Sequence, residues 1–521
     1  MVMSEKQRML IFWASFAALA AAGAGFALRV MSQIYWADQY TQIDTQVGEI
    51  FGLSLWPIAV TMILFSLIID KVGYRAAMFI ACALQIASVI LTAQAADSLN
   101  TLKWACFLGG LGHGVIEACI NPLCASIYPH KKTAMLNILH AAWPAGIIIG
   151  GSTFLLMNAQ QTNWHTAFWI MLIPIAIYGI IFATIKAYPQ DQRVEAHVSN
   201  KDMLKEFGAL GAFLAITFVA YELISQVLHF QGITQGIVAE HKLATSTAIG
   251  LVGAALFYLK FNAIGKWLFF ILCIIMIPLA ATELGTDAWI RGLMEPVMGM
   301  ENAGWAIVAS AGIMMVLRFF AGIILKFISP PMLLFISSIF SMLGLYALST
   351  STGNMIFAAF VLYAIGQTFY WGTMLGFVAE RFPKGGAMTI NTVSAIGLLT
   401  IGIFGAPFLG YVKTSFETQT VQAYAIKENI PQIEKYITQE HFFFIDYDAV
   451  VTNKVKQDDA LSPAQLTALT AEIDNSARQT LKIAALMPLF MAIAFGMIII
   501  YFKSKGGYAP VELEDQKTQQ T

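Results

Sequence analysis

The chain has 521 residues, of which 58% are hydrophobic and 12% are charged, and its formal net charge is −1. Soluble domains carry about 25% charged residues, so this composition cannot cover a surface that faces water. The balanced charge also lacks the excess of basic residues that nucleic-acid binding requires. Together with a mean hydropathy of +0.68, these values predict an all-α protein embedded in a lipid bilayer, with no nucleic-acid partner.

Apolar stretches of about 20 residues, long enough to cross a bilayer as a helix, recur along the whole chain. The first runs from Met9 to Met31 and exceeds the apolar core of about 7–15 residues of a signal peptide, so we expect it to remain as a span. The shortest is 243–259. The fourteen predicted spans are 9–31, 49–69, 76–96, 102–127, 135–157, 166–186, 207–230, 243–259, 266–286, 303–325, 332–349, 354–378, 387–411 and 481–502.

Basic residues in the short segments between spans indicate orientation, because Lys and Arg are retained on the cytoplasmic side. Segments on the side of the N-terminus hold nineteen of them, Arg318 included, against four on the other side. This contrast predicts an even number of spans and two cytoplasmic termini. The expected units are a six-helix bundle in 1–187, a cytoplasmic linker with an inserted helix pair in 188–265, a second six-helix bundle in 266–505, and a cytoplasmic tail in 506–521.

A short loop joins the second and third spans and carries Ser66, Asp70, Gly73 and Arg75. A small residue such as Ser66 allows close approach of two helices. An Asp at the cytoplasmic end of a helix can accept hydrogen bonds from backbone N–H groups of a facing helix and from Arg75. We predict a contact that locks an inner gate, with an ordinary basic turn as the alternative.

This loop resembles the signature loop of the major facilitator superfamily, in which a small residue and three others precede Asp-Arg-x-Gly-Arg-Arg. Here Ser66, Lys71 and Tyr74 depart from that pattern. The resemblance implies the major facilitator fold, two six-helix bundles that rock around a central solute site. With the inserted helix pair, it implies about 14 transmembrane helices.

The fourth span contains a carboxyl group at mid-membrane, where an ionisable side chain costs about 2.5–3.5 kcal/mol on insertion scales. This residue is Glu117, and Asn121 follows one helical turn later on the same face. Such an expensive group suggests a function. We hypothesise that Glu117 couples the binding of a proton and of a solute; the alternative is a structural ion pair with Arg29.

The same region resembles the fucose permease-like sugar:proton symporters. Their fourth helix carries Ile-Glu-x-x-x-Asn-Pro, matched here by Ile116 to Pro122, and the run Leu136 to Gly146 resembles their fifth helix. The resemblance implies transport of a sugar together with a proton. Fucose permease has an acidic residue in its first helix where this chain has Arg29, so neither fucose nor that coupling scheme is carried over.

An internal repeat links the two halves of the chain. Residues 112–137 align without a gap on 366–391, at an offset of 254, and bring Gly112 onto Gly366 and Asn137 onto Asn391. Each copy holds a glycine-bearing span, an aromatic-Pro pair, a basic turn and a span with Asn near its start. Two parallel six-span halves fit this offset, with spans 207–230 and 243–259 inserted between them.

Polar and aromatic side chains gather at the matched spans, where sites in such transporters lie near the midplane between repeats. Glu283, near the outer end of its span, is followed by Asp287 and Trp289. Acids accept hydrogen bonds from sugar hydroxyls and aromatic faces stack on sugar C–H groups, although single aromatics in membrane helices commonly serve packing. The candidate solute-binding residues are Asn121, Asn137, His140, Trp143, Glu283, Gln367, Tyr370 and Trp371.

Residues 412–480 form a polar segment on the outer side. Stretches 431–440 and 462–480 are expected to be helical. For the second stretch, Ser462 can cap a helix whose first turn contains Pro463. A small external cap without chemistry is the expected role.

We therefore expect a secondary active transporter that moves a small polar solute, a sugar, by alternating access coupled to protons or another cation. The alternatives are transport of a peptide, organic acid or drug, and a non-transporting sensor that uses 412–480. The sequence contains no nucleotide-binding, metalloprotease or nucleophile-elbow signature, so we expect neither an enzyme nor a cofactor, and no metal at the isolated His113 and His140. The protein is expected in the bacterial inner membrane as a monomer.

Overall fold

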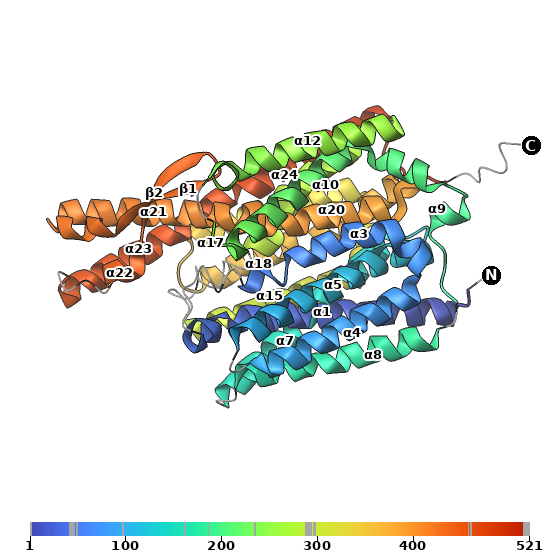
Figure 1. The fold of residues 1–521 in the computed structure, drawn as a ribbon. Helices are drawn as coiled ribbons and strands as arrows, with labels where there is room; N and C mark the ends of the chain where they lie inside the picture. Colours follow the sequence, from blue (N-terminus) through green and yellow to red (C-terminus); the bar gives the residue numbers. More distant parts are fainter. Residues whose placement is uncertain are drawn as a thin grey trace, which may run out of the picture.

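The computed structural model of the chain describes residues 3–40, 47, 50–95, 98–160, 163–185, 187–233, 236–286, 294, 299–456, 458 and 461–513. Thirteen of the helices within these ranges are long and apolar enough to cross a membrane. Helix α5 (Leu99–Ile127) is the fourteenth expected span; Gly, His, Glu and Asn interrupt its apolar sequence, and it packs beside its neighbours in the bundle (Figure 1). The all-α membrane fold is confirmed.

The first group of helices begins with a capping box, in which Ser4 accepts from the backbone of Gln7. Gly73, at φ +78°, ends one helix and begins the next in a left-handed conformation that favours glycine. The members besides α5 are α1 (Glu5–Gln39), α3 (Trp56–Val72), α4 (Tyr74–Ala93), α6 (Lys132–His140), α7 (Ala142–Ala159), η2 (Trp164–Met171) and α8 (Leu172–Thr184).

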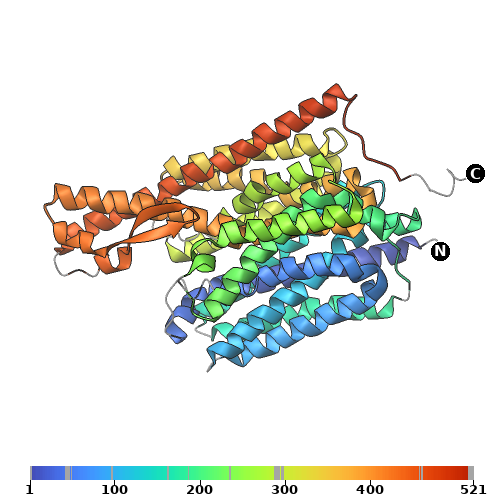
Figure 2. The ribbon, with the colours of Figure 1, turned by 45° about the horizontal axis from the view of Figure 1, so that its top comes forward.

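The expected inserted pair is present and lies along the outside of the bundle (Figure 2). It consists of α10 (Asn200–Phe230) and α12 (Lys242–Phe261), flanked by the short α9 (Gln192–Glu195) and α11 (Ile237–Glu240). Gly208, at φ +66°, kinks α10 where the chain meets Gly265, and a Cβ on Gly208 would lie 2.1 Å from the Cα of Gly265. Close backbone contact between these two glycines therefore holds α10 against the segment that leads into the second group.

The second group contains two short π-helical segments that face each other, η3 (Ala281–Gly285) and η5 (Ile401–Gly405). Such segments are frequent at functional sites. The predicted span 354–378 is broken near Phe369. The remaining members are α13 (Trp267–Ala280), α15 (Met300–Phe319), α16 (Ala321–Ile324), α17 (Pro330–Thr350), α18 (Met355–Gln367), α19 (Tyr370–Arg381), η4 (Pro383–Gly385), α20 (Gly386–Thr400), α21 (Ala406–Lys427) and α24 (Leu486–Ser504).

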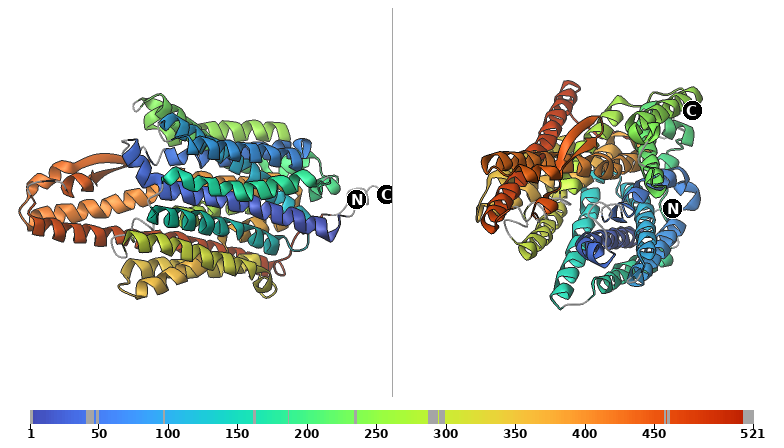
Figure 3. Two further views of the ribbon diagram at one scale, coloured as in Figure 1. Left: turned by 90° about the horizontal axis from the view of Figure 1, so that it is seen from below. Right: turned by 60° about the vertical axis from the view of Figure 1, so that its left-hand side comes forward.

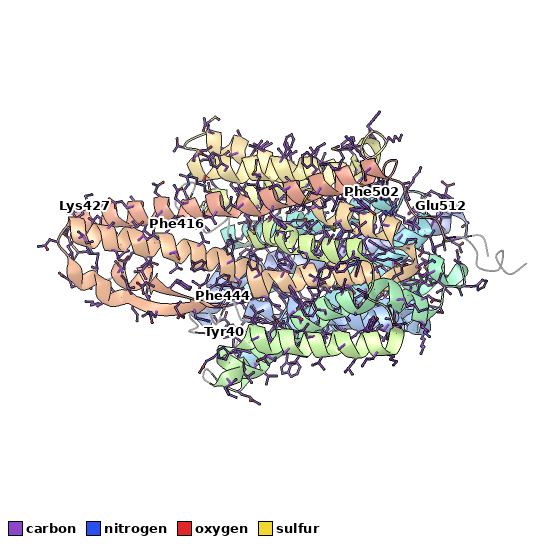
Figure 4. The ribbon with its side chains drawn as sticks, turned by 90° about the horizontal axis from the view of Figure 1, so that it is seen from above. Tyr40, Phe416, Lys427, Phe444, Phe502 and Glu512 are labelled. Carbon is purple, nitrogen blue, oxygen red and sulfur yellow. The ribbon has the colours of Figure 1, made fainter. Side chains whose placement is uncertain are left out.

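A cap projects from the bundle at the end opposite both termini (Figure 3). Lys427 lies at its far tip and Glu512 at the opposite end of the molecule (Figure 4). The cap joins the extended end of α21 to η6 (Pro431–Tyr436), β1 (Ile437–Phe442), β2 (Ile445–Val450), α22 (Thr452–Lys456) and α23 (Pro463–Ala484). Its core contains Val421, Ile433, Val450, Leu469 and Ile473.

The two helices expected in the cap have different outcomes. The one at 462–480 is confirmed, with Ser462 as its cap in a capping box with Gln465. The one at 431–440 is wrong from Ile437 onward, because that segment pairs as β1 with β2 in an antiparallel hairpin, Ile437 opposite Val450. The strand depends on a partner that comes after a turn, which local helical propensity does not reveal.

Equivalent asparagines of the repeat cross between the two groups. Asn137 on α6 donates from Nδ2 to Thr373 Oγ1 of α19 at 3.0 Å. Asn391 on α20 donates to Ser66 Oγ at 2.9 Å and to the carbonyl of Ala118 at 3.1 Å. The alignment at offset 254 thus pairs two asparagines that each form a hydrogen bond to the opposite half. The domain boundaries at 187, 265 and 505 stay a prediction.

Helix α19 approaches α6 through two glycines four residues apart. A Cβ on Gly372 would lie 2.8 Å from the Cα of Asn137, and one on Gly376 would lie 2.4 Å from the Cα of Thr133. Small residues at this spacing let helix backbones approach closely in a membrane. The terminus side of the bundle is therefore closed by backbone contact between the groups.

We predict that Gly376→Ala separates α19 from α6, because its Cβ meets backbone atoms that cannot move away by changing rotamer. Spin labels at the exposed positions His130 and Lys384 should report longer distances by pulsed electron paramagnetic resonance. Gly312→Ala is the control, because no atom lies within 4 Å of its new Cβ. Unchanged distances in Gly376→Ala would contradict the prediction.

Candidate functional site

A small pocket lies between the two groups of helices, and both contribute to its walls. The first group supplies side chains from α5, α6 and α7, and the second group supplies side chains from η3, α15, α19 and α20. Its lining residues are His113, Glu117, His140, Trp143, Glu283, Leu284, Arg318, Trp371 and Leu398. The pocket has the place expected for a solute site between repeats.

A polar chain starts on one face of α5, where His113, Glu117 and Asn121 recur every four residues. Glu117 Oε2 accepts from Asn121 Nδ2 at 2.6 Å, and Glu117 Oε1 lies 3.7 Å from His113 Nε2. Asn121 Oδ1 lies 2.9 Å from His140 Nε2. The buried carboxyl group is thus held by amide and imidazole groups of its own half.

A second buried carboxylate belongs to the other half. Glu283 Oε1 pairs with Arg318 Nη2 at 2.7 Å, and the two side chains are 2% and 1% exposed. Arg318 also donates from Nε to the carbonyl of Thr368 at 2.6 Å and from Nη1 to the carbonyl of His140 at 2.7 Å. Through His140, the polar chain of α5 reaches the Arg318–Glu283 pair across the interface.

Two prolines explain why backbone carbonyls are available for these crossing bonds. Proline has no N–H, so it leaves the carbonyl four residues earlier without its helical partner. Pro144 frees the carbonyl of His140, which accepts from Arg318. Pro122 frees the carbonyl of Ala118, which accepts from Asn391. Neighbouring helices satisfy such groups in membrane proteins.

The predicted solute-binding residues fall into two sets. His140, Trp143, Glu283 and Trp371 line the pocket, and Asn121 stands behind it, bonded to Glu117 and His140. The others are buried elsewhere: Asn137 bonds to Thr373 across the interface, Tyr370 OH donates to Ser337, and Gln367 contacts Met314.

The alternative ion pair between Arg29 and Glu117 is wrong. Arg29 donates from Nη2 to Ser88 Oγ at 2.9 Å within the first group, whereas Glu117 contacts His113 and Asn121. Nothing is described for Asp287 and Trp289, which lie outside the described residues. Their expected place, at the mouth of the second half or merely at the membrane interface, stays a prediction.

The position of Arg318 was also predicted wrongly. It was counted among the basic residues of the cytoplasmic segments, but it is buried at the end of α15 and pairs with Glu283. A signal was available, because Arg318 falls inside the predicted span 303–325, where a charge is expensive. His113 also lines the pocket beside Glu117, although it is not among the predicted solute-binding residues.

The loop after α3 contributes to closure on the terminus side, but with other partners than expected. Asp70 pairs with Arg193 of α9, while Arg75 donates to the carbonyl of Ala183 at 2.8 Å. The expected Asp70–Arg75 contact is therefore wrong. The carboxylate that accepts a backbone N–H from the facing half is Asp191, bonded to Ala387 N at 3.3 Å.

A second cluster closes the same side around Glu380, at the end of α19. Its Oε1 accepts from Thr133 Oγ1 and its Oε2 from Tyr508 OH, each at 2.5 Å. Lys132 Nζ donates to the carbonyl of Ala379 at 3.2 Å. Sequence reasoning did not predict this cluster, because its partners are more than 100 residues apart along the chain.

We predict that Arg318→Met lowers the thermal stability of the purified protein. Removing one partner of a buried ion pair costs about 3–5 kcal/mol, because the other charge stays buried without compensation. The double substitution Arg318→Met, Glu283→Met should recover part of the lost stability, measured by thermal unfolding in detergent. Equal stability of wild type and Arg318→Met would contradict the assignment of this pair.

Comparison with known proteins identifies the family and the fold. The sequence matches the family described as Major Facilitator Superfamily over residues 14–407. No curated protein matches it. The proton:xylose symporter XylE aligns with a TM-score of 0.59 at 11% identity, covering 94% of this chain and 95% of that one.

Two further solved structures are similar over nearly the whole chain. The E. coli fucose:proton symporter FucP aligns with a TM-score of 0.54 at 12% identity, covering 94% of this chain and 98% of that one. A bacterial homolog of the human lysosomal transporter Spinster aligns with a TM-score of 0.59 at 15% identity, covering 98% and 100%. These TM-scores show a shared fold. The chain is a member of the major facilitator superfamily of membrane transporters.

Proposed function

We propose that the protein is a proton-coupled symporter of a small polar solute, a sugar, and that the pocket between the two groups of helices is its solute site. The observation that carries this proposal is the polar chain from Glu117 through Asn121 and His140 to Arg318 and Glu283. It joins a protonatable carboxyl group to the contact between the halves.

The pocket has the chemistry that a sugar requires. Trp143 and Trp371 come from opposite halves and offer aromatic faces, while Glu117, Glu283 and His140 offer hydrogen-bonding groups to hydroxyls. A few polar groups in a mostly apolar pocket fix the orientation of a small ligand. XylE and FucP are described as sugar:proton symporters, which supports a sugar, although the Spinster homolog is another kind of transporter.

Glu117 is our candidate for the coupling group. An ionised carboxylate accepts from Asn121 and attracts His113; a protonated carboxyl becomes a donor and loses that attraction. A change in the hydrogen bonding of Asn121 alters its contact with the His140 ring, and the carbonyl of His140 accepts from Arg318 of the other half. Protonation and the approach of the two halves are therefore linked through adjacent hydrogen bonds.

The gate completes an alternating-access cycle. Asp70, Asp191 and Glu380 hold the terminus side closed, and we propose that this side faces the cytoplasm. Release of these contacts opens the pocket to that side. We further propose that the protein acts as a monomer in a bacterial inner membrane, with the cap on the outer face.

We predict that Glu117→Gln in reconstituted vesicles abolishes uphill accumulation driven by a proton gradient but retains solute counterflow. Glutamine keeps an oxygen that accepts from Asn121 and cannot exchange a proton. Glu222→Gln is the matched control, because Glu222 is a buried carboxyl group on the inserted helix α10, away from the pocket. Full proton-driven accumulation by Glu117→Gln would eliminate this coupling role.

We predict that a neutral sugar raises the melting temperature of the purified protein, and that Trp371→Ala reduces this rise at least severalfold. The measurement is a thermal-shift screen of sugars and organic acids at two pH values. Trp104→Ala serves as the control, because Trp104 is 61% exposed on the outside of the bundle. A response to carboxylates alone would replace the sugar by an organic acid as the transported solute.

A further inference from the structure

A second pocket, with room for about one water-sized molecule, lies wholly within the first group of helices. Its walls come from α1, α3, α4, α5 and η2, so it is separate from the pocket between the halves. Four polar side chains, Arg29, Ser54, Gln85 and Ser88, line it together with His113. The proposed transport of a solute does not use this pocket.

The guanidinium of Arg29 is buried there without a counter-charge. Arg29 is 6% exposed, and its Nε makes no hydrogen bond within the part of the chain that the structure describes. Its Nη2 donates to Ser88 Oγ, its plane lies near the Phe168 ring, and the Cys106 thiol is beside it. No described Asp or Glu forms an ion pair with Arg29.

The geometry of the neighbouring helices makes room for this cation. A Cβ on Gly109 would lie 2.3 Å from Arg29 Nη2, and one on Gly25 would lie 3.0 Å from Nη1. The two glycines thus form a slot for the guanidinium. Gly109 is eight residues from Glu117 along α5, about 12 Å at the rise of an α-helix, which puts that carboxylate out of reach of a direct pair.

A buried charge without a partner is strongly unfavourable, and proteins pair such charges or bind an ion to them. Arginine has five N–H donors in a planar fork, and the Nε–H of Arg29 has no acceptor among the described residues. Tyr178 OH donates to Gln85 Oε1 at 3.0 Å, so the amide NH₂ of Gln85 remains as a further donor. The walls therefore offer positive charge and hydrogen-bond donors.

We propose that this pocket binds a small monovalent anion, a halide or a simple carboxylate, beside Arg29. The anion supplies the negative charge that the described residues do not. His113 lines both pockets and stacks on Trp143 at 5.4 Å. Occupancy therefore changes the electrostatic environment of His113, whose Nε2 lies 3.7 Å from Glu117 Oε1.

The test measures the melting temperature of the full-length protein in detergent at constant ionic strength, as sodium chloride or sodium formate replaces the sodium salt of a bulky sulfonate. Binding to the folded state raises the melting temperature with anion concentration until the site is saturated. We expect this rise in the wild type and its loss in Arg29→Gln. A rise with chloride alone assigns a halide, and one with formate alone assigns a carboxylate.

Arg478→Gln is the matched control, because Arg478 is equally buried, at 6% exposed, but donates to the carbonyls of Leu348 and Ser351. It should keep the full anion response. The proposal is overturned if neither anion stabilises the wild type, if Arg29→Gln keeps the response, or if Arg478→Gln loses it. The measurement needs no transport, so its outcome is independent of the proposed symport.

Discussion

The interior of a bilayer contains no water, so each buried polar group must find its partner within the protein. In this chain two prolines break that balance locally, at Pro122 and Pro144. The carbonyls that they free belong to Ala118 and His140, and both accept from a side chain of the opposite half. The requirement to satisfy backbone groups thus creates specific hydrogen bonds between the two halves.

These crossing bonds join the pocket to the gate. His140 contacts Asn121 through its ring and Arg318 through its carbonyl, so one residue belongs to the polar chain of Glu117 and to the interface. On the terminus side, Asn391 bonds to Ser66, which precedes the Asp70 loop by one helical turn. We propose that a change at the pocket reaches the gate through helices that these hydrogen bonds connect.

Much of the fold could be predicted from sequence, because spans depend on runs of apolar residues and the repeat leaves a constant offset. The polar contacts could be predicted only in part. Glu117 and Asn121 share a helix face, so their contact follows from spacing. Other pairs meet only after the helices or strands have packed: Arg318 with Glu283, Asp70 with Arg193, and β1 with β2. In sequence alone, a basic residue at the end of a span also resembles a basic residue in a loop.

The Arg318 contacts also explain why a buried ion pair is compatible with movement between the halves. Glu283 and Thr368 belong to the same half as Arg318 and can stay with it, whereas the carbonyl of His140 belongs to the other half. Separation of the halves therefore breaks one hydrogen bond of this cluster, from the guanidinium to a backbone carbonyl, and leaves the charge paired. Water entering the opened pocket can then bind the freed carbonyl. A pair split between the two halves would instead expose two uncompensated charges at each cycle, at a far higher cost.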